Sequence, residues 1–170
     1  MLLSGSTVVR FGRLLPLALW VGGLVFFAFI LAPFAFHTLS THEAGVVVGG
    51  TLRILHGMGL ACGALFLVLT LVGSGPARSH RYFSGECALA CAMIAFTASS
   101  QFGVLPKMER FRAEAGGNID AAGDASPARI GFENLHKLSE QIEGAVLLSG
   151  LGLLLLVAGE NPPQRIRDRE

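Results

Sequence analysis

The chain has 170 residues, of which 52% are hydrophobic and only 15% are charged, and its formal net charge is +1. A soluble globular domain carries about 25% charged residues, so this chain has too little charge to cover a water-exposed surface of its size. The near-zero net charge leaves no electrostatic footprint for DNA or RNA. The composition therefore argues against a soluble enzyme, a disordered chain and a nucleic-acid-binding protein, and favours one membrane domain.

Four charge-poor stretches are long enough to cross a bilayer, whose core of ~30 Å needs about 20 helical residues. They predict helices at about residues 14–36, 53–73, 85–105 and 133–158. The sequence contains no alternating segments of the kind that build a membrane barrel. It therefore predicts an all-α fold, an integral membrane four-helix bundle in a single domain over residues 1–160, with a polar tail at 161–170. The first stretch is too long for a cleaved signal peptide, so we expect it to be retained.

The fourth stretch contains the polar residues that are hardest to place. Its uncharged run from Ala145 to Ala158 would rise only about 21 Å as a helix, which is short of the hydrocarbon core. To cross, the helix must begin near Leu138, and this brings Glu140 and Glu143 into the membrane region. Either the bilayer thins locally, or these groups face protein or water.

Positive charge gives the expected orientation. Seven Lys and Arg residues fall on the side of the two termini and six on the other, with tight arginine clusters at the span ends on the termini side. This bias predicts that both termini are cytoplasmic, an N-in/C-in topology. We expect the protein in the inner (plasma) membrane of a bacterium.

The predicted topology gathers polar residues in the non-cytoplasmic leaflet or its interface. The residues are His37, His42, His56, Gln101, His136, Glu140 and Glu143. His56 is either an interfacial histidine beside a packing surface, or a ligand or proton carrier in a polar pocket. His136 and Glu140 share a helix face, which is either the wet face of an amphipathic helix or part of a metal or proton site.

These residues are the candidate ligands of a cofactor. His56 and His136 could bind haem b or copper from facing helices, as in membrane cytochromes, with Glu140, Gln101 and His37 as further candidate metal ligands. The cysteines Cys62, Cys87 and Cys91 lack zinc spacing and are interpreted as packing residues. The alternative is a Cu(I) relay of these thiols with Met58 and Met93.

Small residues and prolines shape the predicted helices. Gly59 and Gly63 form a small-xxx-small pair, which lets a neighbouring helix approach closely. Pro33 is expected to kink the end of the first helix.

Two motifs resemble a known family. Trp20, Gly22 and Gly23 followed by Pro33, and the segment from Phe132 through His136 to Ser139, are similar to motifs at the first and last helices of a family of small four-helix membrane proteins. This family includes eukaryotic transmembrane protein 205 and has no assigned function. The first helix more distantly resembles copper-resistance D-like proteins and the membrane protoporphyrinogen oxidases; the latter imply haem. The resemblance implies the four-helix architecture and points to His136 and Ser139, without naming a reaction.

The sequence thus predicts a small membrane protein with a binding or accessory role and a polar pocket between the starts of the second and fourth helices. The alternatives are a haem- or copper-binding protein and a structural subunit of a larger complex. No nucleophile elbow, phosphate loop or zinc-protease motif is present, so a non-enzymatic role is favoured. The expected partners are the lipid bilayer and other membrane subunits or a second copy of the chain, and no nucleic acid.

Overall fold

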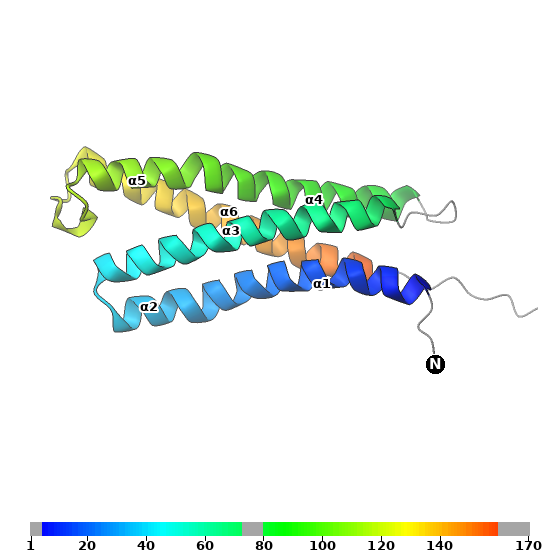
Figure 1. Ribbon diagram of the computed structural model, residues 1–170. Helices are drawn as coiled ribbons and strands as arrows, with labels where there is room; N and C mark the ends of the chain where they lie inside the picture. Colours follow the sequence, from blue (N-terminus) through cyan, green and yellow to red (C-terminus); the bar gives the residue numbers. More distant parts are fainter. Residues whose placement is uncertain (1–4, 73–79, 160–170) are drawn as a thin grey trace, which may run out of the picture.

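A computed structural model describes residues 5–72 and 80–159, and its regular elements within these ranges are all helical. In chain order they are α1 (Gly5–Phe26), the π-helix η1 (Phe27–Leu31), α2 (Ala32–Thr38), α3 (Thr41–Val72), α4 (His80–Ser99), the π-helix η2 (Ser100–Val104), α5 (Leu105–Glu114), the 3-10 helix η3 (Ile119–Ala121) and α6 (Pro127–Ala158). They form four long rods, since α1, η1 and α2 run on as one helix, and α4, η2 and α5 as another (Figure 1). The polar tail predicted at 161–170 lies outside the described residues.

Each rod is long and apolar enough to cross a membrane. The candidate spans are Thr7–Thr38, Thr41–Val72, Gly85–Glu114 and Pro127–Ala158. The predicted all-α four-helix membrane bundle is therefore confirmed. We call the end of the bundle that carries Leu39, Ser40 and η3 the loop end, and the opposite end, where α1 begins and α6 ends, the termini end (Figure 1).

The helices extend well beyond the charge-free stretches. The second helix begins at Thr41 instead of about 53, because Ser40 and Glu43 form a capping box. Glu43 Oε2 accepts from the backbone N–H of Ser40 at 3.2 Å, and Ser40 Oγ accepts from the N–H of Glu43 at 3.3 Å. The third helix continues from about 105 to Glu114, where Gly116 and Gly117 end it with positive φ angles of 72° and 93°. A 32-residue helix rises about 48 Å, so the bundle projects past the hydrocarbon core.

A π-turn precedes each of two prolines. The N–H of Ala32 bonds to the carbonyl of Phe27, and the N–H of Leu105 bonds to that of Ser100, both five residues back. In a regular α-helix the rings of Pro33 and Pro106 would clash with the carbonyl four residues earlier, and the wider π-turn relieves this clash. The helix expected to end in a kink at Pro33 therefore continues through it to Thr38.

The two halves of the bundle are structural repeats of one another. Each half is a long helix broken by a π-turn and a proline, followed by a long return helix. Arg13 and Glu86 precede their π-turns by the same number of residues, as do Trp20 and Met93, and all four are buried. Both leading helices run from the termini end to the loop end (Figure 1). The halves are therefore parallel repeats about an axis along the bundle.

The return helices α3 and α6 show the same repeat in their buried positions. Leu52, His56, Gly59, Gly63, Phe66 and Thr70 match, at identical spacings, Ser139, Glu143, Val146, Gly150, Leu153 and Val157. All of these residues are buried except Glu143, which is half-buried. Neighbouring rods are antiparallel, and each packs against two others: α1 against α3 and α6, and α4 against α3 and α6.

Close packing at the centre depends on glycine. A Cβ at Gly59 would lie 2.2 Å from Trp20 Nε1, and one at Gly63 would lie 2.7 Å from the Trp20 ring. In the second half, a Cβ at Gly150 would lie 2.6 Å from Val21 and 3.0 Å from Met93. Gly59 and Gly63 on α3 therefore form the surface against which the core residue Trp20 packs.

Candidate functional site

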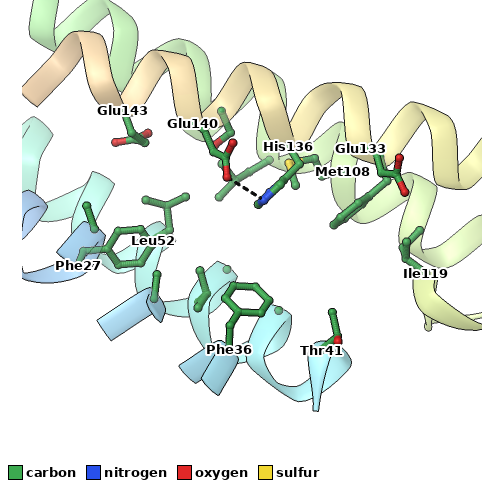
Figure 2. Close-up of a pocket in the computed structure, with 18 of the residues that line it drawn as sticks. Phe27, Phe36, Thr41, Leu52, Met108, Ile119, Glu133, His136, Glu140 and Glu143 are labelled. Carbon is green, nitrogen blue, oxygen red and sulfur yellow. Dashed lines mark ion pairs between the residues drawn. The ribbon is translucent and has the colours of Figure 1, made fainter. Parts of the chain in front are cut away.

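A cavity of about 710 Å³ opens between the two halves at the loop end. One wall comes from α1, η1, α2 and α3, and the other from α5, η3 and α6 (Figure 2). Equivalent positions of the two halves face it, among them Leu52 and Ser139, and Ala32 and Leu105. The cavity therefore lies on the axis that relates the repeats.

The two walls differ in chemistry. The first half contributes mainly apolar and small residues, including Phe27, Phe36 and Leu52. Across from them, one face of α6 presents a polar stripe: Glu133, His136, Ser139, Glu140 and Glu143 (Figure 2). Spacings of three and four place these side chains above one another on the helix. The cavity is amphipathic because the repeats have diverged.

A buried histidine joins three rods at the inner end of this stripe. His56 on α3 is 1% exposed. Its Nδ1 lies 3.1 Å from Gln101 Oε1 on η2, and its Nε2 lies 2.6 Å from Glu143 Oε1 on α6. Of the polar residues that the sequence placed in one leaflet, these three come together.

The contacts of His56 use both of its ring nitrogens, with Gln101 Oε1 at Nδ1 and Glu143 Oε1 at Nε2. The tautomer of the ring decides which nitrogen donates. The other carboxylate oxygen, Glu143 Oε2, is buried and has no hydrogen-bond partner among the described residues.

His136 and Glu140 form a separate pair nearer the mouth of the cavity. His136 Nε2 lies 3.2 Å from Glu140 Oε1, and both side chains are about half exposed or more (Figure 2). The His136 ring stacks on Phe132, with ring centroids 6.3 Å apart. About 10 Å of helix separates His136 from Glu143. His56 and His136 thus lie near the same cavity, but each is paired with a different glutamate, His56 with Glu143 and His136 with Glu140.

Metal or haem ligation would require this arrangement to change. Both ring nitrogens of His56 are engaged, so binding through either would break a contact. Within residues 5–72 and 80–159, no three His, Cys, Asp or Glu side chains gather as metal ligands. His37 is exposed on α2 and does not line the cavity. Cys62 on α3 and Cys91 on α4 are free thiols.

The structure also reveals a buried ion pair that the sequence did not suggest. Arg13 on α1 and Glu86 on α4 meet at the termini end, with Nη2 2.5 Å from Oε2, and are 3% and 0% exposed. Arg13 Nε also donates to Thr70 Oγ1 on α3 at 3.1 Å, and its guanidinium lies over the Phe66 ring. In the sequence, Arg13 and Glu86 each stand just before an uncharged run. This position was the signal that could have indicated their burial, because the helices begin earlier than those runs and include both residues.

The remaining residues of the two family-like motifs have distinct places. Trp20 is in the core, and Gly23 would bring a Cβ to 2.8 Å from Leu55. Gly22 is exposed with open space around it. Phe132 and Ser139 line the cavity. The motif on the last helix therefore lies at the cavity. In the motif on the first helix, Trp20 and Gly23 lie in the packing, whereas Pro33 lines the cavity.

Four apolar rods of spanning length, built as two hairpins around a cavity, define a small integral membrane protein of the four-helix bundle class. Residues 15–116, more than half of the chain, match the family described as Domain of unknown function (DUF4149), and the chain belongs to this family. No curated protein and no solved structure matches it. The site must therefore be interpreted from its own chemistry.

Proposed function

We propose that the protein binds a small amphipathic molecule in the cavity between its two halves. The observation that carries the proposal is the division of the cavity walls, one mainly apolar, with Thr41 and His42 as its polar residues, and one bearing the polar stripe of α6. Ligand pockets are typically apolar concavities with a few convergent polar groups, and volumes of about 300–1,000 Å³ are usual. The apolar body of the ligand packs against Phe27, Phe36 and Leu52, and its polar end lies toward Glu140 and Glu143.

The inner end of the cavity supports a binding role because Glu143, which lines it, is held in place by residues behind it. His56, Gln101 and Glu143 come from three different rods and fix one another through two contacts. Groups held in place before binding cost less entropy when the ligand arrives. The polar end of the ligand therefore meets an ordered partner.

Neighbouring glycines on α3 provide a sharp test. Gly49 lines the cavity and has nothing within 4 Å of its Cβ position, so Gly49→Phe fills the cavity without straining the fold. Gly50 has equally open surroundings but does not line the cavity. We expect Gly49→Phe to weaken binding at least tenfold and Gly50→Phe to leave it unchanged.

The measurement is calorimetric titration of nanodisc-embedded protein, with empty nanodiscs subtracted to remove partitioning into lipid. The probes are tetraphenylphosphonium and triphenylphosphine oxide, which carry similar apolar bodies with a charged and a neutral polar centre. Saturable binding of either probe that Gly49→Phe abolishes supports the proposal. Absence of saturable binding, or equal effects of the two phenylalanine variants, refutes it.

We further propose that both termini are cytoplasmic and that the cavity opens in the non-cytoplasmic leaflet of a bacterial inner membrane. The support is the arginine bias at the termini side of the sequence. A reporter that is active only in the cytoplasm should be active when fused after Glu170. If a reporter that requires export is active at that position instead, the orientation is the reverse.

A further inference from the structure

We infer that the ligand of the cavity is a membrane lipid, whose headgroup enters sideways through an opening between α2 and α6 while its acyl chains stay in the bilayer. This inference rests on the proposed binding function and names the ligand class of the same site. It follows from where the cavity is open, from the depth of that opening along the helices and from the apolar surface beside it.

Packed elements border the cavity on three sides. Towards the termini end α1 and α6 touch, since a Cβ at Gly150 would lie 2.6 Å from Val21. Between α3 and α5, the guanidinium of Arg112 reaches α3, where a Cβ at Gly45 would lie 3.6 Å from its Nη2. At the loop end, η3 packs against α3 and α6, and its residue Ile119 is buried.

The fourth side, between α2 and α6, is open to the outside of the bundle. On the first rod, Phe29, Pro33 and Phe36 line the cavity and are also exposed. On α6, Glu140 and Gly144 do the same. Phe36 and Glu140 lie on opposite sides of the cavity (Figure 2). Residues that face both the cavity and the exterior mark the two edges of an opening.

This opening lies at the depth where the hydrocarbon core ends. The pair of Arg13 and Glu86 stands just outside the uncharged runs at the termini end. A core of ~30 Å measured from this pair extends over about 20 helical residues, and so ends near Pro33 on the first rod. Phe29 and Phe36 flank this level. The opening therefore faces the region where lipid headgroups meet their acyl chains.

The surface next to the opening suits acyl chains. One helical turn from Phe29 and from Gly144, on the side of the bilayer centre, lie Val25 and Leu148. They are 39% and 72% exposed, belong to uncharged stretches and do not line the cavity. A lipid whose headgroup occupies the cavity can therefore lay its chains along these two helices without leaving the bilayer.

The charges that line the cavity favour a zwitterionic headgroup over an anionic one. Five carboxylates stand against two guanidinium groups and two histidines: Glu109, Asp120, Glu133, Glu140 and Glu143, with Arg112, Arg129, His42 and His136. Arg112 is engaged by Glu109 and Arg129 by Glu133, each at 3.0 Å. Even with both histidines protonated, the carboxylates are in excess, so a net negative headgroup is repelled. The ammonium group of a zwitterionic headgroup has carboxylate partners on α6.

Photo-crosslinking of the wild-type protein in nanodiscs tests the orientation of the lipid. One probe is a phosphatidylcholine with a diazirine on its choline group, and the other carries the diazirine at the end of an acyl chain. Mass spectrometry of the peptides locates the labelled residues. We expect the headgroup probe to label Leu52, which is buried in the cavity wall, at least fivefold more than the chain probe does. The chain probe should label Leu148 instead.

Three tryptophan variants locate the entrance. Gly144 has nothing within 4 Å of its Cβ position, so Gly144→Trp obstructs the opening without straining the fold and should reduce the labelling of Leu52 at least fivefold. Gly57→Trp is the matched control, because Gly57 is equally exposed and open but does not line the cavity. Thr41→Trp places the same bulk where the cavity meets the loop end. Both should leave the labelling unchanged.

The host lipid of the nanodisc tests the headgroup class. With the headgroup probe as a minor component, labelling of Leu52 relative to Leu148 should be at least threefold weaker in phosphatidylcholine than in phosphatidylglycerol. The reason is that only the zwitterionic host competes for the cavity. Equal labelling in the two hosts would overturn the assignment to a zwitterionic headgroup.

The remaining outcomes separate this inference from the proposed function. Equal labelling of Leu52 by both lipid probes contradicts headgroup entry, and so does a loss of labelling in Thr41→Trp but not in Gly144→Trp. Leu52 could stay unlabelled while tetraphenylphosphonium or triphenylphosphine oxide still binds in a manner that Gly49→Phe abolishes. The cavity then binds small amphiphiles but no lipid, and only this inference fails. If Leu52 stays unlabelled and neither of those two compounds binds, both proposals fail.

Discussion

Replacing Arg13 with methionine should destabilise the bundle by about 3–5 kcal/mol, which is the usual cost of removing one partner from a buried ion pair. The substitution removes the contact of the guanidinium to the fully buried Glu86 carboxylate, and it removes the bond to Thr70. The midpoint of thermal unfolding in detergent micelles should fall by on the order of 10 °C. Arg10→Met is the matched control. Arg10 lies one turn away and donates to the carbonyl of Ala158 at 2.6 Å, but it is only half-buried.

Two double variants sharpen this prediction. Arg13→Met with Glu86→Leu should recover most of the lost stability, since an apolar pair replaces the ion pair. The exchange Arg13→Glu with Glu86→Arg should recover part of it, because the two positions are equivalent in the repeats. Recovery is incomplete because the residues on α6 that match Thr70 and Phe66 are Val157 and Leu153, which offer neither a hydroxyl nor an aromatic ring. An Arg13→Met variant as stable as Arg10→Met would contradict the assignment of a structural ion pair.

The second large effect is expected at Gly59, where leucine should force α1 and α3 apart. Its Cβ would approach Trp20 Nε1 to 2.2 Å, and overpacking of this kind costs about 1–3 kcal/mol, or more when helices must separate. The clash is with Trp20, so Gly59→Leu combined with Trp20→Ala should lose less stability than the sum of the two single changes. Thermal unfolding in detergent measures all three proteins.

Gly57 is the control for this prediction. It lies on the same helix, is exposed, and has nothing within 4 Å of its Cβ position. Gly57→Leu should change the unfolding midpoint by no more than a degree or two. If Gly57→Leu and Gly59→Leu are equally damaging, the loss has a cause common to both positions, such as altered lipid contacts, and the close approach of Trp20 is not its cause.

The sequence was sufficient for the fold class but not for the helix ends. Uncharged runs indicate which residues cross the hydrocarbon core of the membrane, and they were enough to locate all four rods. They do not report where a helix stops outside the membrane, which here depends on the capping box at Ser40 and on Gly116 and Gly117. The π-turns were not predicted either. Pro33 indicated a disturbed helix, but whether a helix kinks or widens at a proline depends on the packing around it.

The sequence predicted part of the arrangement near the cavity. Topology placed His56 and Gln101 at one level of the bundle, and the structure brings them to 3.1 Å, while their role as ligands stays a prediction. It did not distinguish Glu140 from Glu143 as the partner of His56, because a single turn of α6 separates them and only the rotation of that helix decides which one points inward. The Arg13–Glu86 pair and the repeat were missed because equivalent positions carry different residues, and identity survives in few places, such as Pro33 and Pro106.

The repeat explains why the charges on the axis can be complementary. In a dimer of two identical hairpins, a residue on the two-fold axis meets its own copy, so arginine would face arginine, and glutamate would face glutamate. Joining the hairpins in one chain removes this restriction, because each copy of the position can mutate alone. Arg13 could then meet Glu86, and His56 could meet Glu143. Ionic contacts at the axis are therefore a property that only the covalently linked pair of hairpins could acquire, and a symmetric dimer of either hairpin should lack both.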